Sequence, residues 1–268
     1  MSQSEPLLPC FWKDNRLTAV WAVAALAPVV AAVAERSFAL LVPLVLVLGL
    51  AGLWQVAFAR LRNRVMGWDG IVTAMIFVLL VPVTAPLWQL GLSLSFGLVM
   101  GDLVFGGRGR GFLSPATVGL AFLLFSFPEG GAAEPGMATT LAAVGSGAVL
   151  LAASVLSWRV VAGFFIAMAA LAVPWAMPDE WPALPGATLI LGLVFLIGDP
   201  VAAACTNAGR WAYGLLAGAL VLLFGHEGGG ILSSMVFAAL LASIFAPLID
   251  QVVIWANIRR RARRRCDV

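Results

Sequence analysis

Four aspartates stand at or near the ends of long apolar runs: Asp69, Asp102, Asp199 and Asp250. If such a run crosses a membrane, its carboxylate is a functional candidate that can bind a cation, relay protons or pair with an arginine. Asp69 and Asp199 are also placed where they could cap a helix or meet interfacial water, whereas Asp102 and Asp250 lie further inside their runs. We predict an ion- or proton-coupling role for Asp69, Asp102 and Asp250.

A glycine-rich stretch at 105–119, FGGRGRGFLSPATVG, is the second candidate site. A Walker loop ends in Gly-Lys-Ser/Thr and a dinucleotide fingerprint follows a strand, but this stretch has no lysine and joins two apolar runs. We therefore do not expect a nucleotide loop here. Arg108 and Arg110 are explained as a positively charged turn, whereas the glycines predict unusual backbone angles or a close approach of backbone.

Few residues are available for metal or nucleophilic chemistry. The chain has one histidine, His226, which excludes a haem held by two histidines. Cys10, Cys205 and Cys266 are isolated, so we expect neither an iron–sulfur cluster nor a disulfide framework in this chain. Hydroxyl side chains in apolar runs most often bond to helix backbones. Those that remain candidates for ligand contacts are Ser114, Thr117, Thr139 and Thr206.

The composition predicts that helices in a membrane position these residues. Hydrophobic residues make up 62% of the 268 residues, charged residues make up 11%, and the mean hydropathy is +1.02. Such values are typical of an all-α integral membrane protein. Ten spans fit, at 18–34, 38–59, 69–84, 87–105, 112–127, 139–157, 160–177, 185–199, 211–225 and 231–257.

The basic residues predict the orientation and exclude nucleic acid as a partner. With the N-terminus inside, fifteen of the sixteen Lys and Arg residues are cytoplasmic, including six arginines at 259–265, and only Arg36 is outside. This distribution follows the positive-inside rule. We therefore expect a multi-pass protein of the bacterial inner membrane with both termini in the cytoplasm.

Two segments are similar in sequence and predict an internal repeat. They are FLSPATVGLAFLL at 112–124 and ILSSMVFAALLAS at 231–243, in the fifth and tenth spans. Because these spans cross in opposite directions, they suggest two inverted five-helix repeats at about 18–127 and 139–257. Residues 1–17 are then a cytoplasmic N-terminal segment, 18–257 the ten-helix membrane domain, and 258–268 a basic cytoplasmic tail.

Three stretches together carry a family resemblance. They are WDGIVTAMIFVLLVP at 68–82, FGGRGRGFLSPATVGLAFLLFSFP at 105–128 and GDPVAAACTNAGRWAYGLLAGALVLL at 198–223, followed by FAALLASIFAPLID at 237–250. In order and spacing they resemble the NqrB/RnfD family of membrane subunits, found in sodium-translocating NADH:quinone reductase and in the Rnf electron-transport complex. The likeness extends from about 60 to 257.

The resemblance implies electron transfer through a flavin, FMN or riboflavin. The family esterifies FMN to the threonine of an Asp-x-x-Ser/Thr-Gly-Ala-Thr motif, and AAEPGMATTL at 132–141 is the counterpart. Thr139 matches the attachment residue, whereas Ala133, Gly136 and Met137 depart from the motif. Covalent and non-covalent binding therefore both remain open. Flavin contacts are expected at Gly106, Gly107, Arg108, Ser114, Pro115, Thr117, Thr139, Asp199, Thr206 and Asn207.

The resulting prediction is an electron-transfer subunit of a larger oxidoreductase complex, rather than a stand-alone enzyme. Its partners would be membrane and peripheral subunits, the lipid bilayer and a quinone, and its electron flow would couple to Na⁺ or H⁺ movement. Two alternatives stay open: a transporter or channel built on an inverted-repeat bundle, and a cofactor-free membrane anchor for a redox enzyme.

Overall fold

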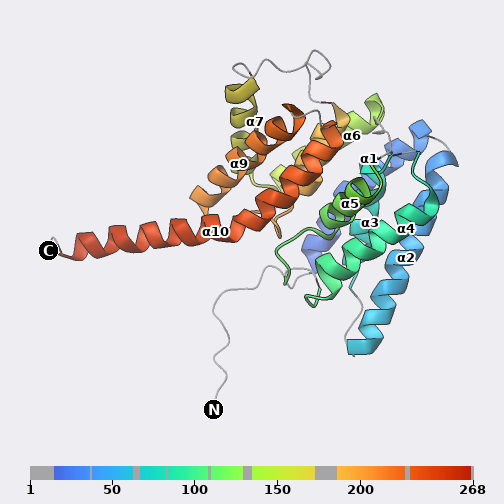
Figure 1. The fold of residues 1–268 in the computed structure, drawn as a ribbon, viewed down its shortest axis with the longest axis horizontal. Coiled ribbons are helices and arrows are strands. Elements are labelled where there is room, and N and C mark those ends of the chain that lie inside the picture. The colour runs from blue at the N-terminus through green and yellow to red at the C-terminus, as the bar shows by residue number, and fades with distance from the viewer. Residues whose placement is uncertain are drawn as a thin grey trace.

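The computed structural model describes residues 15–36, 38–62, 67–82, 84–107, 110–128, 135–172, 186–226 and 230–266, and it has no strand in these ranges. The prediction of an all-helical chain is confirmed for this part of the protein (Figure 1). The elements are α1 (Asn15–Arg36), α2 (Phe38–Arg62), α3 (Asp69–Leu80), α4 (Leu87–Leu98), η2 (Val99–Leu103), α5 (Pro115–Ser126), α6 (Met137–Ala152), α7 (Trp158–Ala172), α8 (Ala187–Gly192), η3 (Leu193–Ile197), α9 (Asn207–His226) and α10 (Ile231–Cys266). The labels η2 and η3 denote π-helical turns.

The described helices fall into two length classes. Four are long and apolar enough to cross a membrane, within α1, α2, α9 and α10. The others are apolar but shorter; α3 and α5, for example, have 12 residues each. At about 1.5 Å per residue such helices span only about 18 Å, well short of a hydrocarbon core of about 30 Å. Membrane insertion follows from these helices, whereas the count of ten crossings stays a prediction.

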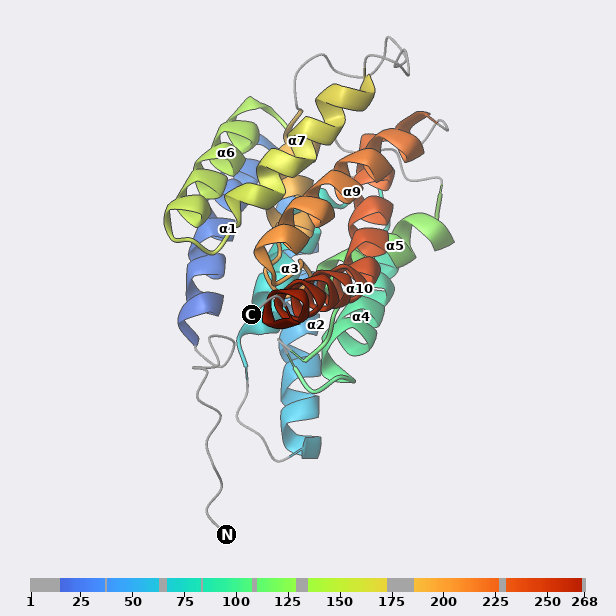
Figure 2. The same cartoon turned by 90° about the vertical axis from the view of Figure 1, so that its left-hand side faces the viewer.

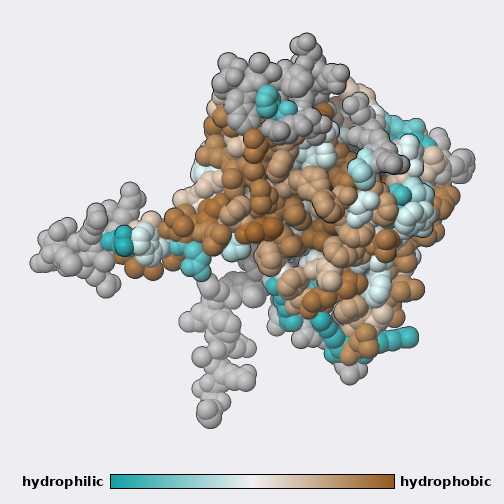
Figure 3. All heavy atoms as spheres, in the orientation of Figure 1, coloured by the Kyte–Doolittle hydropathy of each residue, from teal (hydrophilic) through white to brown (hydrophobic). Residues whose placement is uncertain are grey.

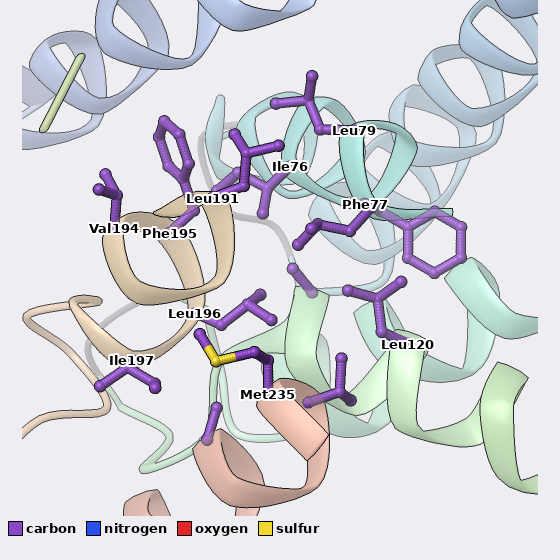
Figure 4. Close-up of a cluster of buried hydrophobic side chains, with 14 of the residues drawn as sticks. Ile76, Phe77, Leu79, Leu120, Leu191, Val194, Phe195, Leu196, Ile197 and Met235 are labelled. Carbon is purple, nitrogen blue, oxygen red and sulfur yellow. The ribbon is translucent and has the colours of Figure 1, made fainter. Parts of the chain in front are cut away.

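Three of the shorter helical segments, α3, α5 and α8 with η3, form the centre of the molecule. Figure 4 shows Ile76 of α3, Leu120 of α5 and Met235 of α10 in one cluster with η3, while the ring of Phe77 in α3 lies on the side of α5. Leu191, Val194, Phe195, Leu196 and Ile197 from α8 and η3 complete this cluster, and all are buried. Short or interrupted helices are tolerated at membrane depth when surrounding protein satisfies their backbone groups, and that is how these central helices are placed.

The longer helices surround this centre. Helix α1 packs on α6, α2 on α3 and α4, and α9 on both α7 and α10. Figures 1 and 2 show this arrangement from two sides. Glycines allow the closest approaches: a Cβ on Gly97 of α4 would lie 2.7 Å from the backbone of Gly119 in α5, and one on Gly214 of α9 would clash with the Val160 carbonyl of α7. Small residues at helix interfaces are typical of membrane bundles.

The surface is also that of a membrane protein. Figure 3 shows that hydrophobic residues cover much of the visible described surface. Large apolar side chains are exposed on several helices, including Val23, Val45, Phe125 and Val252. An apolar surface this extensive is expected when lipid, rather than water, is the solvent.

Observed helix boundaries differ from the sequence expectations by several residues at a number of places, and the ends of α10 and α6 are clear examples. Helix α10 continues to Cys266, although we expected the span to end at 257. Arginine and alanine are good helix formers, and the segment holds no glycine or proline to stop it. Helix α6 ends at Ala152 instead of 157, because Ser154 adopts a positive φ of 57° and turns the chain.

Candidate functional site: a cleft lined by three aspartates

A narrow cleft lies where four segments meet near the centre of the bundle. Asp69 and Thr73 come from α3, Gly101 and Asp102 from η2, and Asp199 from the turn after η3. Gly111, Leu113 and Pro115, at and before the start of α5, complete the lining together with Val201. The three family-like stretches at 68–82, 105–128 and 198–223 therefore meet at this one place. Of the thirteen predicted site residues, it brings together Asp69, Asp102, Pro115 and Asp199.

Asp69 is the first residue of α3, where a negative charge is favoured by the helix dipole. One carboxylate oxygen accepts a 2.7 Å hydrogen bond from the Thr18 hydroxyl of α1. The hydroxyl of Thr73 bonds back to the Asp69 carbonyl at 3.1 Å. The buried amide of Gln55 in α2 secures the same turn: in the orientation that satisfies both groups, it donates to the Gly67 carbonyl and accepts from the Gly70 N–H at 2.6 Å.

Asp102 lies in the π-helical turn η2, and the residue is only 4% exposed. In this turn the N–H of Val104 donates to the Val99 carbonyl, five residues earlier, at 2.9 Å. The chain then reverses because Gly106 and Gly107 have φ values of 104° and 102°, and both N–H groups bond to the Asp102 carbonyl. The predicted unusual backbone at these glycines is confirmed. Isolated π-helical turns are frequent at functional sites.

Asp199 follows the second π-helical turn, η3, and is 5% exposed. The N–H of Gly198 closes η3 by bonding to the Leu193 carbonyl at 2.8 Å. The Asp199 carboxylate accepts from the Val201 N–H at 3.0 Å, so it shapes the turn that follows. The hydroxyl of Tyr213 in α9 donates to the Ile197 carbonyl at 3.1 Å, which fixes the end of η3.

The start of α5 forms the remaining wall of the cleft. Ser114 is buried as the residue before the helix, and Pro115 occupies the first helical position, which suits its missing N–H. A Cβ on Gly101 would lie 2.7 Å from the Cα of Pro115, so glycine is required for η2 to approach α5 this closely. Thr117 is also buried, and its hydroxyl has no hydrogen-bond partner among the described residues.

Three carboxylates on one small cleft concentrate negative charge, which attracts cations and protons. The cavity volume of the cleft is about 10 Å³, room for roughly one water molecule. That volume is far below the roughly 300 Å³ of the smallest pockets for small organic ligands. No group of three or more His, Cys, Asp or Glu side chains in the described ranges is close enough to hold a metal ion. The chemistry that the lining offers is that of carboxylates, which bind small cations or protons.

Asp250, the fourth predicted aspartate, lies at a different place. It sits in the middle of α10 and caps the start of α9: it accepts from the N–H of Cys205 at 2.7 Å and from the N–H and hydroxyl of Thr206 at 3.0 and 2.6 Å. Thr206 in turn accepts from the Gly209 N–H at 3.1 Å. Asn207 begins α9 and is exposed. The geometry of Asp250 and Thr206 is that of a helix cap.

Cys205, beside this cap, is exposed at the surface. Desolvation raises the pKa of its thiol above the ordinary value, and the charge of Asp250 raises it further, while Arg210 opposes both effects. A thiol with a raised pKa is a poor nucleophile at neutral pH. Cys205 is therefore not an activated nucleophile.

Thr139 lies apart from the cleft, at the start of α6, and is fully buried. Its hydroxyl donates to the Glu35 carboxylate at 2.6 Å. Glu35, near the end of α1, also accepts from the N–H groups of Gly136, Ala138 and Thr139 at 3.0, 2.6 and 3.2 Å. A carboxylate from another helix thus occupies the anion-binding position that a helix N-terminus offers. Arg108 lies outside the described residues.

Three polar residues that organise these places were not predicted from the sequence: Thr18, Gln55 and Glu35. Gln55 had a usable signal, because it is the only amide in the apolar run at 38–59. Glu35 is an acid between the first two apolar runs, but its position gave no hint of a partner about a hundred residues away. Thr18 had no signal, since a threonine near a span end is ordinary.

The chain is similar to known proteins over most of its length. A family model for NQR2, RnfD and RnfE proteins matches residues 13–133 and 129–259. The NqrB proteins of Na(+)-translocating NADH-quinone reductase from Pseudomonas aeruginosa and Klebsiella pneumoniae are each 34% identical, over 80% of this chain and 66% of theirs. The corresponding protein of Azotobacter vinelandii is equally similar. The chain thus spans slightly less than two thirds of the length of these relatives, and it belongs to the NQR2, RnfD, RnfE family.

Proposed function

We propose that this chain is a membrane subunit of a multi-subunit redox complex, in which electron flow is coupled to the movement of Na⁺ or H⁺. One observation carries the proposal: the three stretches that resemble the family meet at a single cleft lined by Asp69, Asp102 and Asp199. The relatives are named as subunits of a sodium-translocating NADH-quinone reductase. The inner-membrane location, the further subunits and the quinone are parts of the same proposal.

The proposed architecture is a ten-helix domain, at 18–257, of two inverted repeats at about 18–127 and 139–257. The packing supports it, because three helices of the first half contact the helix five places later: α1 packs on α6, α3 on α8 and α5 on α10. Contacts within one half also recur in the other, for example α4 with α5 and α9 with α10. The two stretches matched by the family model meet at 129–133, between the proposed repeats. In this scheme the cleft lies at the interface of the repeats, where inverted-repeat proteins place their sites.

The proposed topology has both termini in the cytoplasm, with 1–17 and 258–268 as cytoplasmic segments. Positive charge at one end of the bundle supports it. Arg60 and Arg62 end α2, and the Arg62 guanidinium donates to the Val104 carbonyl at 3.1 Å, next to the aspartate cleft. Arg36 and Glu35 lie at the opposite end of α1. The cleft would therefore open toward the cytoplasm, and ions would enter it from that side.

The flavin of the proposed complex, FMN or riboflavin, would be held by this chain without a covalent bond. The described residues do not fit attachment at Thr139, because an ester there would need the hydroxyl that Glu35 now binds in a fully buried site. A non-covalent flavin would find hydrogen-bond partners in Ser114 and Thr117, buried at the start of α5 beside Pro115 of the cleft, once the surrounding side chains move aside. The Thr117 hydroxyl lacks a partner among the described residues. Because the cleft is too small to enclose an isoalloxazine ring, Asp69, Asp102 and Asp199 would act on the ion alone. When bound, flavin supplies the electron-accepting ring.

Chromophore analysis of the purified protein tests the redox proposal. We expect no fluorescent band on a denaturing gel, but release of FMN or riboflavin from the folded protein, unchanged in Thr139→Ala. A fluorescent band that disappears in Thr139→Ala would show covalent attachment. Folded protein without any flavin would contradict the carrier role and favour a transporter or a cofactor-free anchor.

A further inference from the structure

A second hollow lies at the opposite end of α1 from the Thr18–Asp69 contact. It is bounded by Arg36 at the end of α1, Leu40 and Pro43 in the first turns of α2, Val78 and Val81 at the end of α3, and Leu90 in α4. The hollow is narrow, with a cavity volume of about 20 Å³, and it opens to the surface. Apart from the arginine, the side chains that line it are apolar. No step of the proposed ion or electron pathway uses this place.

The guanidinium of Arg36 is buried in an unusual way. Neither Nη1 nor Nη2 is accessible to solvent, and neither has a hydrogen-bond partner among the described residues. The adjacent Glu35 attracts this charge, but both of its carboxylate oxygens are bonded to the start of α6 and neither bonds to Nη1 or Nη2. A charged group that is buried without partners is strongly destabilising. The guanidinium would therefore be stabilised by a hydrogen-bond acceptor, preferably an anion, which the described part of the chain does not provide.

We propose that the Arg36 hollow binds an anionic phospholipid, with the phosphate on the guanidinium and part of an acyl chain along the apolar wall. A guanidinium presents two parallel N–H donors that match two phosphate oxygens. The valine, leucine and proline side chains of the wall offer hydrocarbon a surface without competing polar groups. Basic pockets between membrane helices are a known mode of lipid head-group recognition.

The surroundings place the hollow at the depth of lipid head groups. Trp88, which is 62% exposed, packs edge-on against Phe127 at 5.2 Å, and exposed tryptophans gather at membrane interfaces. At Ala85 the hollow joins a larger and more polar one that includes Thr84, Gln89 and Ser126. That second space can receive the polar remainder of a head group. Val42 and Val45 of α2, both exposed, provide an apolar surface for the rest of the lipid.

Native mass spectrometry of the full chain, with added lipid, tests this proposal. We expect phosphatidylglycerol to bind at least about tenfold more weakly to Arg36→Gln than to the wild type, the effect of losing a charge-assisted hydrogen-bond pair. Arg36→Lys should retain part of the affinity, because it keeps the charge and loses the paired geometry. Arg259→Gln is the matched control: it removes one positive charge from an exposed site on α10, outside the hollow.

Ala85→Leu provides a second, independent variant, which fills the hollow and leaves the arginine in place. It should weaken phosphatidylglycerol binding and leave inorganic phosphate without measurable affinity, as in the wild type. Equal binding of the lipid to wild type and Arg36→Gln, or to wild type and Ala85→Leu, would overturn the proposal. So would inorganic phosphate binding as tightly as the lipid, which would indicate a soluble anion, or a quinone that displaces the lipid from the wild type.

Discussion

Carboxylates lie in two different settings in this protein, at the start of a neighbouring helix and on the wall of a cleft. Glu35 and Asp250 each reach from one helix to the start of another and accept a threonine hydroxyl at 2.6 Å, from Thr139 and Thr206 respectively. Glu35 accepts three backbone N–H bonds in addition, and Asp250 accepts two. Asp102, in contrast, lies in a π-helical turn on the wall of a cleft that it shares with Asp69 and Asp199.

The difference lies in the position of each carboxylate. Glu35 and Asp250 accept three or four hydrogen bonds at the start of a helix, where they replace the partners that a helix N-terminus lacks. Asp102 instead lies on the wall of a cleft, where a cation or proton can approach it. We therefore favour Asp102, and not Asp250, as the coupling residue, although both were predicted for that role.

The largest expected effect is on ion coupling when Asp102 is replaced by asparagine. The substitution removes a charge from the cleft but keeps the size of the side chain. We expect ion transport driven by electron flow to fall at least about tenfold, the cost of losing a charge-assisted interaction with the ion. The measurement is ion uptake by proteoliposomes that contain the whole complex, with electron flow followed in parallel. Unchanged ion dependence at normal electron flow would remove Asp102 from the pathway.

Replacing Asp250 by asparagine should produce the opposite pattern. Its bonds to Cys205 and Thr206 hold the start of α9, so we expect the free energy of unfolding to fall by about 1–3 kcal/mol. Thermal unfolding in detergent measures this loss, and Thr206→Val should reproduce part of it. Ion coupling per folded complex should remain. Loss of coupling at unchanged stability would place Asp250 in the ion pathway instead and would erase the distinction between the two groups.

A smaller effect is expected from the loop that follows Asp102. Gly106→Ala should lower the free energy of unfolding by about 1–2 kcal/mol, because an L side chain is strained at a φ of 104°. Gly145→Ala in α6 is the matched control: a Cβ there meets no atom within 4 Å, and alanine favours a helix. The control should leave the unfolding temperature unchanged or raise it. Equal effects of the two substitutions would show that the loop backbone carries no strain.

The sequence predicted the class of fold and several residues of the candidate site. It did not predict how those residues are arranged in space. Apolar runs and the positions of arginines were enough for a helical membrane protein, because hydrophobic length and charge act locally along the chain. Asp69, Asp102 and Asp199 were found in the same way, as charges at the ends of such runs. Their convergence was not predictable, because it depends on how α3, η2 and η3 pack, and the π-helical turns leave no mark in the hydrophobic pattern.

The main features that the sequence did not predict are hydrogen bonds between residues far apart in the chain. The environment of Thr139 depends on Glu35, which is 104 residues away in sequence, and that of Thr206 depends on Asp250, 44 residues away. A single sequence carries no local signal for either pair. For the same reason Thr139 was identified as a candidate attachment residue from its neighbours in sequence, while the carboxylate that occupies its hydroxyl was not foreseen.

The smallest expected effect is on the reactivity of Cys205, and it tests the placement of the Asp250 charge directly. Because desolvation and Asp250 raise the pKa of the thiol, the thiolate fraction at pH 8 is lower than that of a free cysteine, and alkylation is slow. Asp250→Asn removes a negative charge, lowers the pKa and should speed alkylation about two- to fivefold at pH 8. Arg210→Gln removes a charge that lowers the pKa, so it should slow alkylation and move the pH profile upward. Maleimide labelling between pH 7 and 10, in a chain with Cys10 and Cys266 replaced by serine, measures both shifts. If the alkylation rates of the two variants shift in opposite directions, Asp250 is charged and close to Cys205, as a helix-capping carboxylate is. Equal alkylation rates in wild type and Asp250→Asn would mean that Asp250 does not bear a charge there.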